Sequence, residues 1–338
     1  MSSDSSRLES TGLPAHFPHG GGIEAAARDW RCDVAEILDL STGLHPAGAP
    51  DWLADWLHDH AALAAHYPDR HGEPARTALA AAFQLPPESI LITAGAQAVI
   101  ETIFQAMAWS SMAIEVPCYN EPLRCARRAG CTIRSFAAGD KAPPADLLWR
   151  TSPANPGGHT SPLTPSLQHT HTVLDESYMP FAERRSLGLP ANLIRIGSLT
   201  KTFCIPGLRL GYVIADTHTI ARLKAWLPPW PAATLAQHLL PALLPEADSR
   251  DQQTVAARKR LDALLQHHQW QIRPSVATFI LARPNNSVPD FAAHRILIRT
   301  FPERPQLASW FRFGLPGNEA AWQRLARALE QIDQSPAD

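Results

Sequence analysis

The feature that most constrains the fold of this chain is a regular alternation of short apolar runs with longer, helix-compatible segments between residues 89 and 215. Runs of Val, Ile and Leu with this spacing are typical of strands in a mainly parallel sheet, where the intervening segments are the crossovers. We expect seven strands, at residues 89–93, 111–116, 131–136, 146–151, 171–175, 192–197 and 210–215.

The connection between the last two runs is too short for a comfortable helical crossover between parallel strands. Only residues 198–209 separate them, whereas a crossover between parallel strands needs about a dozen residues or more and usually contains a helix. We therefore expect the final strand to run antiparallel, at an edge of the sheet or at an insertion point.

The pattern changes beyond about residue 225, where two apolar runs at 276–282 and 295–301 follow a long helical stretch at 249–268. The last helix places Trp322, Leu325, Leu329 and Ile332 on one face. We expect a polar, Gly-rich arm at residues 1–45 that contributes to a small domain and to the site. A large domain at 46–225 and a small α+β domain at 226–338 would follow it.

Composition excludes several classes of function. The formal net charge is -2, with 30 basic and 32 acidic side chains in no long run of either sign, so neither nucleic acid nor an anionic membrane is an expected partner. No apolar stretch reaches the roughly 18 to 20 residues of a membrane span, and the first residues lack a signal-peptide pattern. The five cysteines include no CxxC pair. We expect a cytoplasmic protein with reduced thiols and no metal site.

Polar clusters come directly after five of the predicted strands. These clusters read TAGAQ, VPCYN, TSPANPGG, DESY and GSLTK. In an open α/β sheet, ligands bind beyond the carboxyl ends of the strands. The five clusters are therefore expected to meet at one edge of the sheet and to form a single site.

The segment GSLTKTFCIPGLRLGY at 197–212 carries the most specific chemistry. It places Lys201 in a loop with Ser198, Thr200 and Arg209. A lysine amine must lose its proton to attack an aldehyde, and burial beside other cations lowers its pKa.

This segment resembles the class I and II aminotransferase family, in which Ser-x-x-Lys is followed eight residues later by Arg. The resemblance covers nearly the whole chain and continues upstream in the same order. It includes an Asp-x-x-Tyr motif, a shortened Asn-Pro-Thr-Gly motif and a helix start after a strand. The matching residues are Ser198, Lys201, Arg209, Asp175, Tyr178, Asn155, Gly95, Ala96 and Gln97. The resemblance implies an α/β fold of the pyridoxal-phosphate-dependent transferase type I, with pyridoxal 5′-phosphate (PLP) bound covalently to Lys201.

The resemblance also implies a role for each residue around the cofactor. Asp175 would keep the pyridine nitrogen protonated, which makes the ring an electron sink. Asn155 and Tyr178 would donate hydrogen bonds to the ring oxygen, and Tyr119 would stack on the ring face. The residues that would bind the cofactor phosphate are Gly95, Ala96 and Gln97 at the helix start, with Ser198 and Arg209. Tyr67 matches a tyrosine that reaches the phosphate from the partner subunit, which implies an active homodimer.

Two arginines near the carboxyl terminus bear on the substrate. Arg312 matches the family's carboxylate-binding arginine, and Arg299 then suggests a second anion on the substrate. The segment HFPHGGG, with DLSTGLHPAG at 39–48, resembles the threonine-phosphate decarboxylase branch of the family. That branch implies phosphate binding by His19 and Arg299, with Asn155 also contacting the substrate.

The same resemblance departs from the branch in two places. Gly43 and His45 replace asparagines, so Gly43 would offer only its backbone amide to the substrate carboxylate. The family's Thr-Gly after Asn-Pro is Gly157-Gly158 here.

The branch implies decarboxylation of L-threonine O-3-phosphate to (R)-1-amino-2-propanol O-2-phosphate, for cobalamin biosynthesis. Transamination of the histidinol-phosphate type needs nearly the same residues, because the bond that breaks is the one held perpendicular to the cofactor ring. Residue types alone leave both reactions open.

Other classes fit less well. A catalytically silent PLP-binding regulator would usually carry a DNA-binding module, for which the chain has no basic domain. An α/β-hydrolase would need a G-x-S-x-G elbow, and the nearest string is DLSTG. A zinc hydrolase would need HExxH, which is absent from the sequence.

Overall fold

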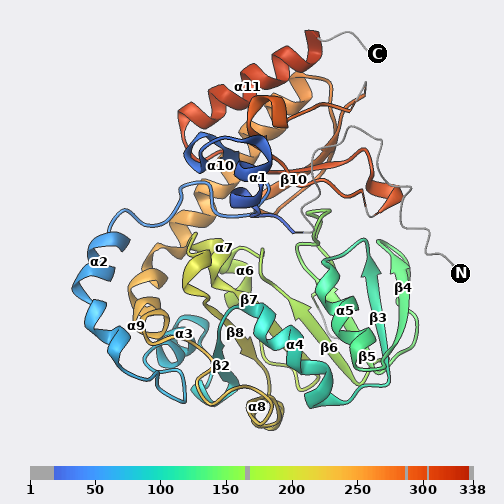
Figure 1. Cartoon of the computed structure of the whole chain (residues 1–338). Helices are drawn as coiled ribbons and strands as arrows, with labels where there is room; N and C mark the ends of the chain where they lie inside the picture. Colours follow the sequence, from blue (N-terminus) through green and yellow to red (C-terminus); the bar gives the residue numbers. More distant parts are fainter. Residues whose placement is uncertain (1–18, 164–167, 286–287, 303, 335–338) are drawn as a thin grey trace, which may run out of the picture.

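The computed structural model describes residues 19–163, 168–285, 288–302 and 304–334. Figure 1 shows two groups of elements: a large sheet with its helices in the lower part, and a smaller group around α1, α10 and α11 in the upper part. None of the described helices is both long and apolar enough to cross a membrane.

The large sheet has the seven strands that the sequence predicts. In spatial order it runs β2-β8-β7-β6-β5-β3-β4. Strand β8 is antiparallel to both of its neighbours, β2 and β7, so it is inserted between them and β2 forms the edge. The strands are β2 (Ile90–Thr93), β3 (Ser111–Val116), β4 (Thr132–Ala137), β5 (Leu147–Thr151), β6 (His171–Asp175), β7 (Leu193–Ser198) and β8 (Gly211–Ile214).

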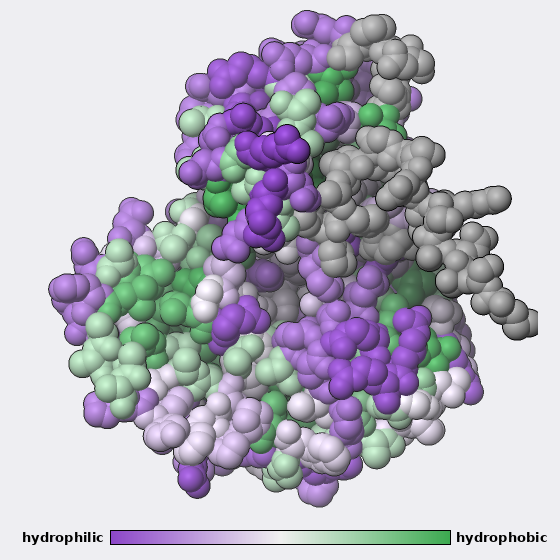
Figure 2. All heavy atoms as spheres, in the orientation of Figure 1, coloured by the Kyte–Doolittle hydropathy of each residue, from purple (hydrophilic) through white to green (hydrophobic). Residues whose placement is uncertain are grey.

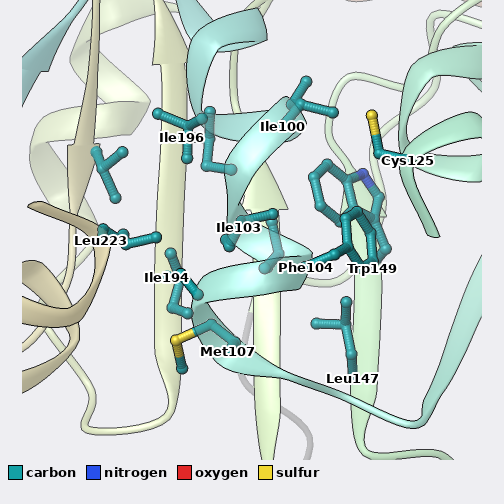
Figure 3. Packing of buried hydrophobic residues seen from close by; sticks show 14 of the residues in the cluster. Ile100, Ile103, Phe104, Met107, Cys125, Leu147, Trp149, Ile194, Ile196 and Leu223 are labelled. Atoms are coloured by element: carbon teal, nitrogen blue, oxygen red, sulfur yellow. The ribbon is translucent and has the colours of Figure 1, made fainter. Parts of the chain in front are cut away.

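Successive side chains of these strands enter two different cores, because a strand presents alternate residues to opposite faces. Leu91 packs with helix α4 on one face, while its neighbours Ile90 and Ile92 pack with α3 on the other. Figure 3 shows Phe104 of α4 lying against Trp149 of the sheet. The helices around the sheet are α2 (Leu53–Asp59), α3 (Ala75–Phe83), α4 (Ala96–Met107), α5 (Asn120–Arg128), α6 (Phe181–Ser186), α7 (Leu199–Thr202), α8 (Thr217–Lys224) and α9 (Thr234–Leu243).

A second sheet lies in the upper group, which we call the C-terminal unit and define as residues 247–334. Strand β10 pairs antiparallel with β9 and β12, and residues such as Ile280, Phe313 and Leu325 form one apolar core with α10. Strand β1, from the amino-terminal part of the chain, pairs with β11. The elements of the C-terminal unit are α10 (Ala247–His267), β9 (Gln271–Arg273), β10 (Phe279–Arg283), β11 (Ile296–Leu297), β12 (Phe311–Gly314) and α11 (Glu319–Gln334), and the upper group also contains α1 (Ile23–Trp30) and β1 (Leu38–Asp39).

Helix α9 packs with the large sheet, although it follows residue 225. Its Ala236 and Leu240 share an apolar core with Leu79 of α3. The long helix α10 then leads into the C-terminal unit. The domain boundaries expected from the sequence stay a prediction.

A buried ion pair joins β6 and β7 directly beside the end of β6. Both side chains, Glu176 and Arg195, have no exposed surface, and the arginine donates to both carboxylate oxygens at 2.9 and 3.0 Å. Tyr212 donates a further hydrogen bond to Glu176 at 2.5 Å. Such a pair is stabilising only when every polar atom has a partner, and this network holds the strand end that carries the site in place.

Candidate active site

A cavity of about 210 Å³ lies at the carboxyl ends of the strands of the large sheet and extends to the C-terminal unit. It brings together most of the side chains that the sequence singles out. Those that line it are His19, Gly43, Ala96, Gln97, Tyr119, Asn155, Asp175, Tyr178, Ser198, Lys201, Arg209, Arg299 and Arg312.

Lys201 stands on the short helix α7, immediately after β7. Its backbone carbonyl accepts a hydrogen bond from the amide of His45 at 3.0 Å, which ties α7 to the loop after β1. Beside it, the hydroxyls of Ser198 and Thr200 lie 2.7 Å apart. The lysine therefore enters the cavity from a fixed turn of helix.

Asp175 is the last residue of β6 and is 5% exposed. One carboxylate oxygen accepts the amide of Ser177 at 3.0 Å. Burial raises the pKa of Asp175 from its usual range, ahead of the opposing effect of the hydrogen bonds from Ser177. A cationic partner in the cavity, such as a protonated pyridine nitrogen, would stabilise the charged carboxylate.

The start of helix α4 forms an anion site with Arg209. Gly95, the N-cap residue, has φ of 75° and packs so closely that a Cβ there would lie 2.8 Å from the guanidinium of Arg209. A Cβ on Gly211 would lie 2.6 Å from the carbonyl carbon of Gly95. These glycines let the guanidinium approach the free amides of the helix start, where the helix dipole also favours a phosphate.

Tyr119 and Gln97 form one wall of the cavity, and Glu121 contacts Gln97 from outside the lining. The Tyr119 hydroxyl donates to the Gln97 side chain at 3.2 Å, and Gln97 donates to Glu121 at 3.0 Å. Burial, followed by the charge of Glu121, raises the pKa of Tyr119, so its hydroxyl stays protonated. His19 reaches this wall: its Nε2 lies 3.4 Å from a Glu121 oxygen, and its ring centroid lies 5.9 Å from that of Tyr119.

The HGGG segment fits against the site because Gly20 has no side chain. A Cβ on Gly20 would lie 2.2 Å from the Ser41 carbonyl oxygen and 3.4 Å from Arg312 Nη2. The amide of Gly21 donates to the Ser41 hydroxyl at 2.8 Å. These contacts place His19 in the cavity.

Arg312 is 6% exposed and crosses from β12 toward the large sheet. It donates to the Asn155 side chain at 2.7 Å and to the Ser41 carbonyl at 2.6 Å. Its Nε is buried and has no hydrogen-bond partner among the described residues. Burial lowers the pKa of Arg312, and an anion bound beside the guanidinium would oppose this effect. A substrate carboxylate would supply both a hydrogen-bond acceptor for Nε and a negative charge.

Tyr178 lies between these residues and the loop after β1. A Cβ on Gly43 would lie 2.6 Å from the Tyr178 ring, so only glycine fits there. The ring packs edge-on against Phe279 at 4.9 Å.

Arg299 and Arg304 come from the same segment of the C-terminal unit. The Arg299 carbonyl accepts the amide of Arg312 at 2.9 Å, and its guanidinium lies over the Phe301 ring at 4.8 Å. Arg304 also lines the cavity and donates to the Cys118 carbonyl at 2.5 Å and to the Asn120 side chain. Sequence reasoning missed Arg304, because FPERPQ matches no motif and has the composition of a turn.

The His159 ring lies beside Gly157, the position at which the family's Asn-Pro-Thr-Gly motif has a threonine side chain. A Cβ on Gly157 would lie 2.7 Å from the His159 ring, and Nε2 of that ring lies 2.6 Å from Glu115. Although burial alone would raise the pKa of Glu115, the hydrogen bonds from His159 and Ser161 lower it overall. The imidazole fills the space beside the loop of Asn155 and is anchored by a charged carboxylate.

His45 lies outside the cavity, behind Lys201. Its Nε2 is 2.8 Å from the Arg250 carbonyl, while its Nδ1 accepts the amide of Ala47 at 3.2 Å. Burial lowers the pKa of His45 to about 4, so the ring is neutral and donates from Nε2. Its contacts tie the loop after β1 to α10.

Tyr67 does not reach the cavity of its own chain. It is 79% exposed and stacks on Trp230 with ring centroids 4.5 Å apart.

The residues fit the cofactor that the sequence implies, on three observations. The cavity holds a lysine, a buried carboxylate and a glycine-lined anion site beside Arg209.

Glu101, Glu121 and Cys125 are close enough to suggest a metal ion. However, Arg124 forms ion pairs with both carboxylates, so these charges already have partners.

Comparison with known proteins agrees with this fit. The family model described as aminotransferase class I and II matches residues 36–329. Threonine-phosphate decarboxylase of Pseudomonas aeruginosa is 30% identical over 332 residues, which cover 92% of this chain and 96% of that protein. Threonine-phosphate decarboxylase of Salmonella typhimurium is 28% identical, with 95% of this chain and 98% of that protein covered.

A solved structure shows the same fold. The histidinol-phosphate aminotransferase of Sinorhizobium meliloti, in complex with pyridoxal 5′-phosphate, superimposes with a TM-score of 0.81. The two sequences are 19% identical, and the match covers 98% of this chain and 99% of the other.

Proposed function

The chain belongs to the class I and II aminotransferase family, and we propose that it is a PLP-dependent decarboxylase of L-threonine O-3-phosphate. The product would be (R)-1-amino-2-propanol O-2-phosphate, for cobalamin biosynthesis. The similarity to two threonine-phosphate decarboxylases over nearly the full length of all three chains supports this reading.

One observation carries the proposal. A single cavity combines Lys201 and Asp175, which suit the cofactor, with two guanidinium groups, those of Arg299 and Arg312, and the imidazole of His19. A substrate with an amino group, a carboxylate and a phosphate has one group for each part of this cavity.

When bound, PLP supplies an electron sink for the pair of electrons that remains when a bond at Cα breaks. Asp175 would hold a proton at the pyridine nitrogen. Asn155 and Tyr178 would donate hydrogen bonds to the ring oxygen, and Tyr119 would stack on the ring. Lys201 would hold the cofactor covalently.

The substrate-binding residues select the bond that breaks. Arg312 binds the α-carboxylate, with the Gly43 amide as a further donor, and Arg299 and His19 bind the phosphate. This anchoring would favour cleavage of the Cα–carboxylate bond, so that the carboxylate would leave as CO2 and Cα would take up a proton in its place. The fixed contacts of Arg312 with Asn155 and Ser41 limit how far its guanidinium can move.

The deciding experiment incubates the PLP-loaded protein with L-threonine O-3-phosphate and measures CO2 and amino-propanol phosphate. We expect stoichiometric release of both without any keto-acid acceptor. A keto product that forms only in the presence of 2-oxoglutarate would instead favour a transaminase of the histidinol-phosphate type, whose fold this chain shares.

The role of Lys201 has its own test. Replacing Lys201 by Ala removes the amine that links the cofactor, so the visible absorbance of the lysine-bound cofactor should be lost. The control is Lys224→Ala, on helix α8 away from the cavity. An unchanged covalent linkage in Lys201→Ala protein would contradict the assignment.

We also propose that the protein acts as a homodimer in which Tyr67 reaches the cofactor phosphate of the partner subunit. Tyr67, Trp226 and Trp230 are large side chains with exposed surface, and Figure 2 shows apolar surface on the side of the molecule where Figure 1 places α2 and α9. Sedimentation should give a dimer. The Tyr67→Phe protein should bind PLP more weakly and should remain a dimer. A monomer with full affinity for PLP would contradict both parts.

A cytoplasmic location is proposed as well, and the five free cysteines agree with it.

A further inference from the structure

Ser41 joins two parts of the cavity wall that the proposed function assigns to opposite ends of the substrate. It is buried and follows β1. Its carbonyl accepts a hydrogen bond from Arg312 Nη2 at 2.6 Å, and its hydroxyl accepts one from the Gly21 amide at 2.8 Å. One buried residue therefore contacts both the arginine proposed to bind the carboxylate and the segment of His19, which is proposed to bind the phosphate.

The side chain of Asp39 fixes the conformation of Ser41. Its Oδ1 accepts the Ser41 amide at 2.8 Å and the Ser41 hydroxyl at 2.6 Å. A serine hydroxyl has one hydrogen to donate, and here a carboxylate takes it, so the lone pairs are left for the Gly21 amide. Hydrogen bonds to a charged acceptor are stronger than neutral ones. Asp39 therefore favours the orientation in which Ser41 holds Gly21.

Backbone contacts hold this turn against the strands of the C-terminal unit. Leu40, between the two polar residues, donates to the Leu297 carbonyl at 2.8 Å and accepts the Gly314 amide at 2.7 Å. It thus contacts β11 on one side and β12 on the other. A Cβ on Gly314 would lie 2.7 Å from the Thr42 carbonyl oxygen. Because β12 also carries Arg312, the turn and this arginine are fixed relative to each other.

The segment of His19 lies directly against the same groups. The close approach of Gly20 to the Ser41 carbonyl and to Arg312 leaves no space for a side chain at that position. Burial lowers the pKa of Arg312, and both Tyr178 and the Asp39 carboxylate act in the opposite direction. The path from the guanidinium to His19 therefore consists of two hydrogen bonds and one tight backbone contact, with the charge of Asp39 beside it.

We propose that Asp39 and Ser41 are positioning residues that fix the spacing between the carboxylate-binding and phosphate-binding ends of the cavity. This spacing selects substrates by the length of the chain between their two anions. Neither residue is among the described residues that line the cavity, so both act through Arg312 and Gly21. The assignment of the two ends rests on the proposed function, whereas the tie between Arg312 and the segment of His19 does not.

Two phosphate esters test the spacing. L-Homoserine O-phosphate has the same charged groups as L-serine O-phosphate, but one more methylene separates its phosphate from its carboxylate. PLP-loaded wild-type protein should bind the serine ester more tightly. Ser41→Ala removes the contact with Gly21 and keeps the carbonyl for Arg312, so the ratio of the two Kd values should fall about fivefold. The visible absorbance of the cofactor, followed by stopped flow, reports binding before turnover.

Variants of Asp39 separate a positioning role from a structural one. Asp39→Asn retains an oxygen that can accept both hydrogen bonds from Ser41, so it should keep most of the discrimination between the esters. Asp39→Ala should lose as much of it as Ser41→Ala does. Ser186→Ala and Asp29→Ala are the matched controls, since both residues are exposed and lie outside the cavity lining.

Hydrogen exchange gives a second readout that needs no substrate. In the PLP-loaded protein, peptides that cover Gly20 and Gly21 should exchange faster in Ser41→Ala and in Asp39→Ala, because the Gly21 amide loses its acceptor or the fixed orientation of that acceptor. Asp39→Asn should exchange nearly as slowly as wild type. The rest of α1 and β1 should be unchanged.

Equal weakening of both esters in Ser41→Ala, or faster exchange throughout α1 and β1, would identify a purely structural role and overturn the proposal. Wild-type protein that binds the two esters equally would overturn it as well. If discrimination and exchange change as expected but L-threonine O-3-phosphate releases no CO2, the proposed function fails while the positioning role stands. Release of CO2 with unchanged discrimination in Ser41→Ala would give the reverse result.

Discussion

At the scale of single residues, the cavity separates the groups that suit the cofactor from the groups that suit the substrate. Lys201, Asp175 and Arg209 stand at or beside strand ends of the large sheet, whereas Arg299 and Arg312 belong to the C-terminal unit. Arg312 depends on a glycine at position 20 and on the Ser41 carbonyl.

Arg299→Ala is the sharpest test at this scale. Removing one partner from a desolvated charge pair should cost roughly 2 to 5 kcal/mol of transition-state stabilisation for threonine phosphate. The measurement is kcat/KM for the phosphorylated substrate, with Arg283→Ala as the control. An equal loss in binding of unphosphorylated threonine would contradict a phosphate-binding role.

The convergence of Asp175, Ser198 and Lys201 on one cavity could be predicted because each belongs to a motif at the end of a strand. Arg304 and His159 could not, for different physical reasons. The sequence position of Arg304 says nothing of Asn120, its partner in the fold. The His159 ring occupies the space that Gly157 leaves by having no side chain, and this packing depends on how the chain folds. Arg304 likewise meets Asn120 only in the folded chain.

At the scale of elements, the loop after β5 depends on a contact with the neighbouring strand β3. The loop carries Asn155, and it is closed by hydrogen bonds from Gly158 to Ala154 and from Ala154 to the His159 carbonyl, at 2.6 and 2.8 Å. The ring of His159 is anchored on Glu115, in β3. The pair thus joins two strand ends.

We expect His159→Ala to loosen this loop and to weaken PLP binding by about tenfold. This corresponds to the roughly 1.5 kcal/mol of a hydrogen bond to a charged group. The pH at which the visible absorbance of the bound cofactor changes should shift as well, because Asn155 is proposed to contact the ring oxygen. His159→Gln, which can still donate to Glu115, should recover most of both effects.

His58→Ala, on the surface of α2, is the matched control for that experiment. A wild-type cofactor affinity and an unchanged absorbance profile in His159→Ala would show that the loop holds its shape without the imidazole.

The positions of the strands in the large sheet were predictable to nearly the residue, because apolar runs of strand length alternate with crossovers. The insertion of β8 between β2 and β7 was left open by the sequence. A short connection requires an antiparallel neighbour but does not say which second strand will pair with it. Helix α9 shows the same limit, since its apolar face identifies a buried helix but not the core that it joins.

At the scale of the whole molecule, His45 joins three distant parts of the chain. Its amide donates to Lys201, and its ring contacts the Arg250 carbonyl at the start of α10. Burial, with a further effect of the Arg250 charge, lowers the pKa of His45 from 6.5 to about 4. The folded protein therefore keeps this ring neutral at a pH where the unfolded chain binds a proton.

This difference predicts how stability changes with pH. Above about pH 7 the ring is neutral in both states, and between about pH 7 and pH 5 only the unfolded state gains a proton. The free energy of unfolding should fall by about 2 kcal/mol over that range. Chemical denaturation at both pH values measures it, and His45→Gln should be less stable at pH 7 but should lack this part of the pH dependence.

His58→Gln, at an exposed position of α2, serves as the control for general effects of removing a histidine. The same fall in stability for wild-type and His45→Gln protein would assign the pH dependence to other groups.

The division of the cavity between two cores has a consequence for how such a protein can change over evolution. In the proposed assignment, the residues of one chain that anchor its own cofactor lie between residues 95 and 209, and most of the substrate-binding cations lie between residues 299 and 312. Mutations in the second stretch can alter which molecule is held, and at what angle, while the first stretch stays under separate selection. Exchanging the short carboxyl-terminal stretch between relatives is thus a route by which one ancestral chemistry can diversify into several.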